Sequence, residues 1–188
     1  MEALLVSMLV VAVGEIGDKT QLLALLLAAR FRQPVAVILG ILVATLLNHS
    51  LAGLAGGWIR DSVSPTTLRW ALGLSFLAIA AWALKPDALD EAPVAPGRFG
   101  AFAVTFAAFF IAEIGDKTQL ATVALAARFD SLPAVVAGTT LGMLIADVPA
   151  VLLAERALAR IPFKTIRYVA AALFAAMGIA ALAGVGFG

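Results

Sequence analysis

The sequence predicts an all-α membrane protein, with six transmembrane helices arranged as two inverted three-helix repeats. The first reason is composition, because 63% of the 188 residues are hydrophobic, 13% are charged and the mean hydropathy is +1.05. A soluble domain of this length could not cover so much apolar surface. The second reason is the heptapeptide Glu-Ile-Gly-Asp-Lys-Thr-Gln, which occurs at Glu15–Gln21 and again at Glu113–Gln119.

The internal repeat extends beyond the heptapeptide at a constant offset of 98 residues. Leu27–Phe31 recurs as Leu125–Phe129, and Gly40, Arg69 and Phe76 match Gly138, Arg167 and Phe174. The chain is therefore a duplicated unit. We expect a first three-helix repeat at residues 1–85, a linker at 86–98 and a second three-helix repeat at 99–188.

Apolar runs place six spans, since a helix needs about 20 residues to cross a bilayer. The expected ranges are 3–29, 34–58, 67–84, 100–127, 132–155 and 166–186. The first and fourth are longer than a straight span requires, and Gly14, Gly17 and Gly115 permit a kink or a break there. The spacings Gly53/Gly57 and Gly138/Gly142 favour close helix packing.

The stretch Pro86–Gly97 has three prolines, three acids and no long apolar run. This composition predicts a solvated linker between the repeats. A metal-binding loop formed by Asp87, Asp90 and Glu91 is the less favoured alternative.

Three spans in each repeat make the second repeat enter the membrane from the opposite side, which is an inverted-topology repeat. Basic residues assigned to the loops after the first, third and fifth spans are Arg30, Arg32, Lys85, Arg98, Arg156, Arg160, Lys164 and Arg167. The other side carries Arg60, Arg69 and Arg128. The positive-inside rule then predicts both termini outside and a cytoplasmic linker.

The repeated motif places charges at membrane depth, where they are costly and usually functional. Glu15 and Asp18 are three residues apart and share one helix face, which Lys19 borders; Glu113, Asp116 and Lys117 repeat the arrangement. Inverted repeats bring equivalent positions together near the midplane, so four carboxylates converge. They must take up protons, pair with the lysines or bind a cation.

The donor set predicts oxygen ligation of a hard or borderline cation such as Mg²⁺, Ca²⁺ or Mn²⁺. Neutral side-chain oxygens are offered by Thr20, Gln21, Thr118 and Gln119, although in a straight helix Thr20 points away from the acidic face unless a local break redirects it. The chain has no cysteine and one histidine, which argues against Cu(I) or Zn²⁺ specificity. The alternative is a pair of intrahelical Glu–Lys salt bridges, which would leave both aspartates unpaired.

Asp147 and His49 occupy equivalent positions of the two repeats, and both fall in a middle span. Asp147 precedes Pro149 and offers a fifth carboxylate as ligand, proton acceptor or lysine partner. We interpret both residues as candidates for proton coupling. Local hydrogen bonding is the alternative for each.

Several functions are disfavoured. The net charge of +1 gives no reason to expect a nucleic-acid partner. Gly-Asp-Lys-Thr is not a phosphate-binding loop, because that loop needs G-x-x-x-x-G-K-[ST] between a strand and a helix. We therefore expect no nucleotide site and no cofactor. The N-terminus lacks a basic region before its apolar run, which predicts a retained helix rather than a cleaved signal.

The doubled signature Glu-φ-Gly-Asp-[Lys/Arg]-[Thr/Ser] resembles that of the GDT family of divalent-cation/proton antiporters, and both copies match at every position. The resemblance covers nearly the whole chain. It implies that Glu15, Asp18, Glu113 and Asp116 bind the metal, and that Mn²⁺ or Ca²⁺ is the transported substrate. The chain also resembles the bacterial members of this family, which export manganese, and this resemblance implies a plasma-membrane protein.

The leading hypothesis is therefore an Mn²⁺ exporter coupled to proton entry, without enzymatic activity. A Ca²⁺/H⁺ antiporter using the same site is the close alternative, because both ions accept oxygen ligands. An exporter of small organic cations, an intramembrane metal-dependent enzyme and a purely structural membrane subunit are more distant. An enzyme would need a nucleophile or base without a twin, and the doubled motif offers none.

Overall fold

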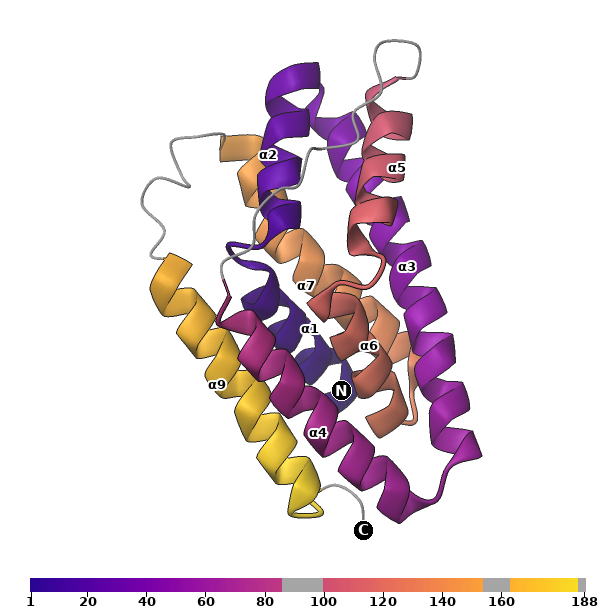
Figure 1. The fold of residues 1–188 in the computed structure, drawn as a ribbon. Coiled ribbons are helices and arrows are strands. Elements are labelled where there is room, and N and C mark those ends of the chain that lie inside the picture. The colour runs from indigo at the N-terminus through magenta and orange to yellow at the C-terminus, as the bar shows by residue number, and fades with distance from the viewer. Residues whose placement is uncertain (86–99, 154–162, 186–188) are drawn as a thin grey trace.

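The structure is a computed structural model that describes residues 1–85, 100–153 and 163–185. In the described part, all regular secondary structure is helical and there is no strand. Its helices are α1 (Glu2–Glu15), α2 (Lys19–Phe31), α3 (Pro34–Ser62), α4 (Pro65–Ala83), α5 (Ala101–Glu113), α6 (Lys117–Arg128), α7 (Leu132–Leu153) and α9 (Phe163–Leu182). Figure 1 shows them packed side by side as an elongated bundle.

Four of these helices are long and apolar enough to cross a membrane: α3, α4, α7 and residues Lys164–Leu182 of α9. α5 is a shorter apolar helix. Together with the composition, they make the chain a multi-pass membrane protein. These four long helices occupy the expected ranges 34–58, 67–84, 132–155 and 166–186. The predicted linker, with its three acids, lies outside the described residues.

The two motif-bearing ranges, 3–29 and 100–127, are not continuous helices. The first is divided into α1 and α2 by Ile16–Asp18, and the second into α5 and α6 by Ile114–Asp116. Of the two possibilities that the motif glycines allowed, the chain adopts a break rather than a kink. In Figure 1 the first broken segment runs upward from α1 to α2, and the second runs downward from α5 to α6.

Local sequence explains where the long helices begin. Proline occupies the first position of both α3 and α4, where its missing N–H costs no helical hydrogen bond. Ser64 caps α4, its hydroxyl accepting a hydrogen bond from the Thr67 amide at 3.2 Å.

Several basic residues that were counted for the positive-inside rule lie within helices near their ends. They are Arg30 in α2, Arg60 in α3, Arg69 in α4, Arg128 in α6, and Lys164 and Arg167 in α9. Long basic side chains at a helix end can reach the membrane interface from there.

Glycines set the close approach of the inner helices. A Cβ at Gly40 of α3 would clash with Thr105 of α5, and one at Gly138 of α7 would clash with Ser7 of α1. These two contacts are equivalent at the repeat offset, so α3 packs on α5 as α7 packs on α1. The expected role in packing is wrong for Gly57, because a Cβ added there would meet no described atom of another element within 4 Å.

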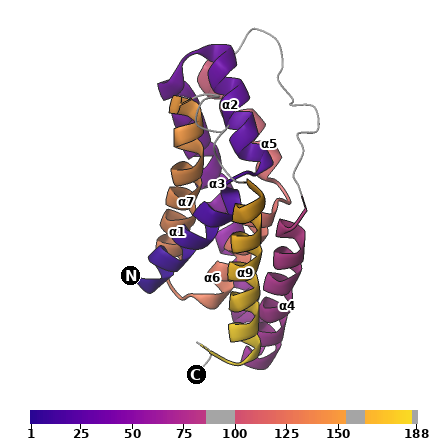
Figure 2. The same ribbon diagram turned by 90° about the vertical axis from the view of Figure 1, so that its left-hand side faces the viewer.

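α4 and α9 pack against each other as an outer pair, adjacent in both views (Figures 1 and 2). Gly73 and Gly178 bring their backbones together, since a Cβ on either would lie about 3 Å from the carbonyl oxygen of the other. Phe76 stacks on Phe174 with ring centroids 6.5 Å apart. These phenylalanines occupy equivalent positions of the two repeats, so the symmetry that relates the repeats places them face to face.

Candidate metal centre

The breaks in the two motif-bearing segments share one backbone conformation. The residue before the glycine is extended in both, with φ −63° and ψ 118° at Ile16 and φ −63° and ψ 117° at Ile114. Gly17 has φ 83° and Gly115 has φ 76°, a left-handed region that glycine adopts at little cost. The glycine of the motif is thus required by the backbone and not by packing alone.

The motif glutamines stabilise these breaks. Gln21 Oε1 accepts a hydrogen bond from the Gly17 amide at 3.0 Å, and Gln119 Oε1 accepts one from the Gly115 amide at 2.7 Å. Each satisfies a backbone group that the interrupted helix leaves without a helical partner. The sequence predicted these oxygens as possible metal ligands, whereas here they are used by the backbone.

The breaks place four carboxylates inside the molecule. Glu15 and Glu113 are the last residues of α1 and α5, while Asp18 and Asp116 are the N-cap residues of α2 and α6. All four are buried. Ligand oxygens of Glu15, Glu113 and Asp116 lie within 4.8 Å of one another, so these three could hold one metal ion. The structure therefore brings together three of the four predicted acids, from both copies of the motif.

The threonines turn toward the acids because the break changes their direction. Thr20 Oγ1 donates a hydrogen bond to Glu15 Oε1 at 2.6 Å. Its counterpart Thr118 donates to Glu113 Oε2 at 3.1 Å and lies 3.2 Å from Asp116 Oδ2. A straight helix would have pointed Thr20 elsewhere, so the break is what brings these hydroxyl groups to the site.

Each motif lysine pairs with the aspartate of the other motif. Lys117 Nζ binds Asp18 Oδ1, and Lys19 Nζ lies 3.0 Å from Asp116 Oδ1. The side chain of Lys117 is 4% exposed, whereas that of Lys19 is 28% exposed. The alternative of lysines paired within their own helix is wrong, because both ion pairs cross between the repeats.

Asp147 adds a fifth buried carboxylate from α7. It lies close enough to Glu15 and Glu113 for its charge to act on both, and the charge of Asp18 acts on Asp147. Among the described residues, neither carboxylate oxygen of Asp147 has a hydrogen-bond partner. His49, its counterpart on α3, is also buried, and within the described part of the chain neither ring nitrogen is hydrogen-bonded.

Two further groups support the site that the sequence did not single out. Gln21 Nε2 donates to the carbonyl oxygen of Ala146 at 2.9 Å, and Gln119 Nε2 donates to Asn48 Oδ1 at 2.7 Å. Ala146 and Asn48 are equivalent at the repeat offset. The adjacency of Asn48 to His49 was the available signal, whereas a backbone carbonyl leaves none.

The electrostatics of this cluster favour a bound cation. Five buried carboxylates face two lysines, and an unpaired buried charge is costly. Glu15 Oε2, Glu113 Oε1 and both oxygens of Asp147 are buried and have no hydrogen-bond partner among the described residues. The donors are carboxylate and hydroxyl oxygens, which are ligands of hard cations.

A multi-pass helical membrane protein with a charged site at two broken helices has the construction of a secondary transporter. The chain matches the family described as "Divalent cation/proton antiporter GDT1" over residues 3–91 and 101–186. It therefore belongs to this family of membrane antiporters. The match includes both motifs and all the carboxylates of the site.

Three similar proteins extend this finding. The chain is 50% identical over 181 residues to a Vibrio cholerae protein named "Putative manganese exporter", covering 96% of this chain and 90% of that one. It is 30% identical to "GDT1-like protein sll0615" of Synechocystis sp., covering 89% and 90%. It is 28% identical to "GDT1-like protein 3" of Oryza sativa, covering 92% and 71%. No solved structure matches the chain significantly.

Proposed function

We propose that the protein exports Mn²⁺ in exchange for protons. The observation that carries this proposal is the buried group of Glu15, Glu113 and Asp116, whose oxygens converge within 4.8 Å. Membership of the antiporter family supports the exchange, and the name of the Vibrio cholerae relative supports manganese. Mn²⁺ is then a substrate, and no resident cofactor takes part.

The proposed exchange follows from competition for the same oxygens. A divalent cation at the three carboxylates replaces the charge that protons would otherwise supply, and it also competes with Lys19 for Asp116. When the cation leaves, the carboxylates must be neutralised again by protons or lysine. Because one site is neutralised by either species, cation and protons cross in opposite directions.

Ca²⁺ is the alternative substrate, since an oxygen-only site accepts both ions. Exporters of small organic cations and intramembrane enzymes are less well supported. Every motif group has an equivalent in the other repeat, and the hydroxyl groups of Thr20 and Thr118 serve as donors to carboxylates. We therefore propose transport without catalysis.

We also propose six membrane crossings as two inverted repeats, at residues 1–85 and 99–188, in the plasma (inner) membrane. The opposite directions of the two broken segments in Figure 1 support this arrangement. The charge count favours external termini and a cytoplasmic linker. Cysteines introduced singly at Gly188 and Asp90 should react with an impermeant reagent from opposite faces, and reaction from one face would contradict the inverted repeat.

The site itself is tested by removing one charge at a time. Glu15→Gln, Asp18→Asn, Glu113→Gln and Asp116→Asn preserve shape, and each should reduce Mn²⁺ transport about tenfold or more. Glu2→Gln and Asp61→Asn are matched controls, because both acids are exposed. Full transport after neutralising one whole motif would show that the two halves do not form a joint site.

A further inference from the structure

The two halves of the chain are nearly identical at the site, yet the structure is not symmetric there. Asp116 belongs to the group of acids that could hold a metal ion, whereas its counterpart Asp18 does not. The reason lies in the lysines. Lys117 is buried on Asp18, while Lys19 is partly exposed on Asp116. Both aspartates are therefore paired with a lysine, but only Asp116, whose lysine is partly exposed, belongs to the group of acids that could hold a cation.

The outer pair of helices shows the same asymmetry. α4 packs on α6, and α9 packs on α1. The equivalent contacts would join α9 to α2 and α4 to α5, and among the described residues neither is formed to a comparable extent. A Cβ at Gly14 of α1 would lie 3.4 Å from the ring of Phe174, so α9 covers the first motif from this side.

Exposure of the two breaks agrees with this arrangement. Ile114, beside the second break, is 59% exposed, whereas its counterpart Ile16 is half-buried. The outer pair thus covers α1 and α6 and leaves the opposite end of the site, near α2 and α5, more open. Figure 2 shows α4 and α9 beside the half of the bundle that contains α1 and α6.

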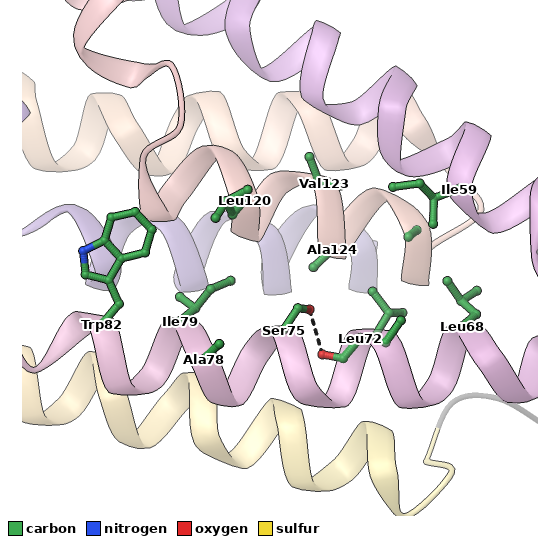
Figure 3. Close-up of a pocket in the computed structure, with 12 residues that line it drawn as sticks. Ile59, Leu68, Leu72, Ser75, Ala78, Ile79, Trp82, Leu120, Val123 and Ala124 are labelled. Atoms are coloured by element: carbon green, nitrogen blue, oxygen red, sulfur yellow. Dashed lines mark hydrogen bonds between the residues drawn. The ribbon is translucent and has the colours of Figure 1, made fainter.

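The contact between α4 and α6 is poorly filled. A cavity of about 290 Å³ lies between them and is lined almost wholly by apolar side chains (Figure 3). Its hydroxyl group, on Ser75, donates its proton to the carbonyl oxygen of Leu72 at 2.9 Å. The cavity is partly open to the outside, so α4 and α6 are in contact over only part of their length, whereas the backbones of α4 and α9 meet closely at Gly73 and Gly178.

We infer that the chain forms a second cation site, made of Glu15, Glu113 and Asp18, in a state that exchanges the roles of the two repeats. In that state Lys19 is buried on Asp116 and Lys117 releases Asp18. The outer pair of α4 and α9 moves as a unit from α6 and α1 to α5 and α2. The ligand of both sites is a hard divalent cation, held by the two glutamates throughout and by one aspartate at a time.

The internal repeat is the physical reason for this second state. Equivalent residues line both arrangements, so exchanging the repeats recreates nearly the same hydrogen bonds and ion pairs at a similar free energy. The buried oxygens of Glu15 and Glu113 that lack partners are already positioned for a cation in the described residues. The lysines then act as internal cations that select which aspartate binds the substrate. This inference rests on the proposed cation transport.

The sequence has no cysteine, so introduced cysteines are its only thiols, and cross-linking chosen pairs of them can hold each state. Ile79 of α4 and Leu120 of α6 line opposite walls of the cavity (Figure 3). The pair Ile79→Cys and Leu120→Cys, joined by a short reducible bifunctional thiol reagent, holds the present state. Their equivalents at the repeat offset, Met177→Cys on α9 and Leu22→Cys on α2, should be joined only in the exchanged state.

Binding of Mn²⁺ alone, followed by electron paramagnetic resonance, is then measured in each cross-linked protein. With α4 joined to α6, Asp116→Asn should weaken Mn²⁺ binding about tenfold or more, and Asp18→Asn should weaken it much less. With α9 joined to α2, the order should reverse. Recovery of transport after reduction shows that each variant is folded.

The same order of effects in both cross-linked proteins would overturn the inference. So would a Leu22/Met177 pair that never cross-links while the Ile79/Leu120 pair does. Either result could accompany normal Mn²⁺/H⁺ exchange by the parent protein, in which case the proposed function stands and only the exchanged state is lost. Absence of Mn²⁺ binding by the parent protein would instead remove the proposed function.

Discussion

Replacement of Lys117 by Met should destabilise the protein far more than replacement of Lys19 by Met. Lys117 is 4% exposed and binds an aspartate that is fully buried. Removing one partner of a buried ion pair leaves an uncompensated charge and costs about 3–5 kcal/mol. Lys19 is 28% exposed, so water can reach the place it leaves beside the buried Asp116, and we expect a smaller loss of about 1–2 kcal/mol.

The measurement is the free energy of unfolding in detergent, with a chelator present so that no divalent cation replaces the lysine. The double variant Lys117→Met/Asp18→Asn is the informative control, because removing both charges eliminates the uncompensated carboxylate. It should recover most of the stability lost in Lys117→Met. Equal losses for the two lysines, or no recovery in the double variant, would contradict two ion pairs that cross between the repeats and differ in burial.

Two further predictions concern the helix breaks and the equivalent positions Asp147 and His49. Gly115→Ala should lower the free energy of unfolding by about 1–2 kcal/mol, because the left-handed backbone strains any Cβ there, although no atom would lie within 4 Å of it. Gly57→Ala is the control: it is also open but lies inside a helix, so it should be neutral or stabilising. Equal effects of the two substitutions would contradict the break. Asp147→Asn should shift the pH dependence of transport more than it weakens Mn²⁺ affinity. His49→Gln should have the same effect to a smaller degree. A loss of Mn²⁺ binding as severe as in Asp116→Asn would instead make Asp147 a ligand.

The sequence was sufficient to predict where the four long helices lie and to select acids that lie together in the structure. Apolar runs fix the ranges because membrane depth sets a minimum length, and the doubled motif identifies the acids because charges in apolar segments are costly. The motif glycines indicated that the first and fourth ranges could bend or break. They did not decide between the two, since a glycine permits a left-handed backbone without requiring it.

The partners of the lysines could not be predicted, because they depend on how closely the two halves approach. Sequence spacing alone offered pairing within one helix, four residues apart, as the alternative. The break removes that geometry and carries each lysine across to the other repeat. The same displacement brings Thr20 to Glu15, and it directs Gln21 to the backbone rather than toward a metal.

The central claim is that one buried carboxylate site exchanges Mn²⁺ for protons, and proton flux in liposomes tests it most directly. Purified protein is reconstituted with the membrane potential clamped, and an Mn²⁺ gradient is imposed while internal pH is recorded. Protons should move opposite to Mn²⁺, an acidic interior should accelerate Mn²⁺ uptake, and Glu113→Gln should abolish both fluxes. Mn²⁺ flux without proton movement, or flux that ignores the imposed pH gradient, would contradict the account.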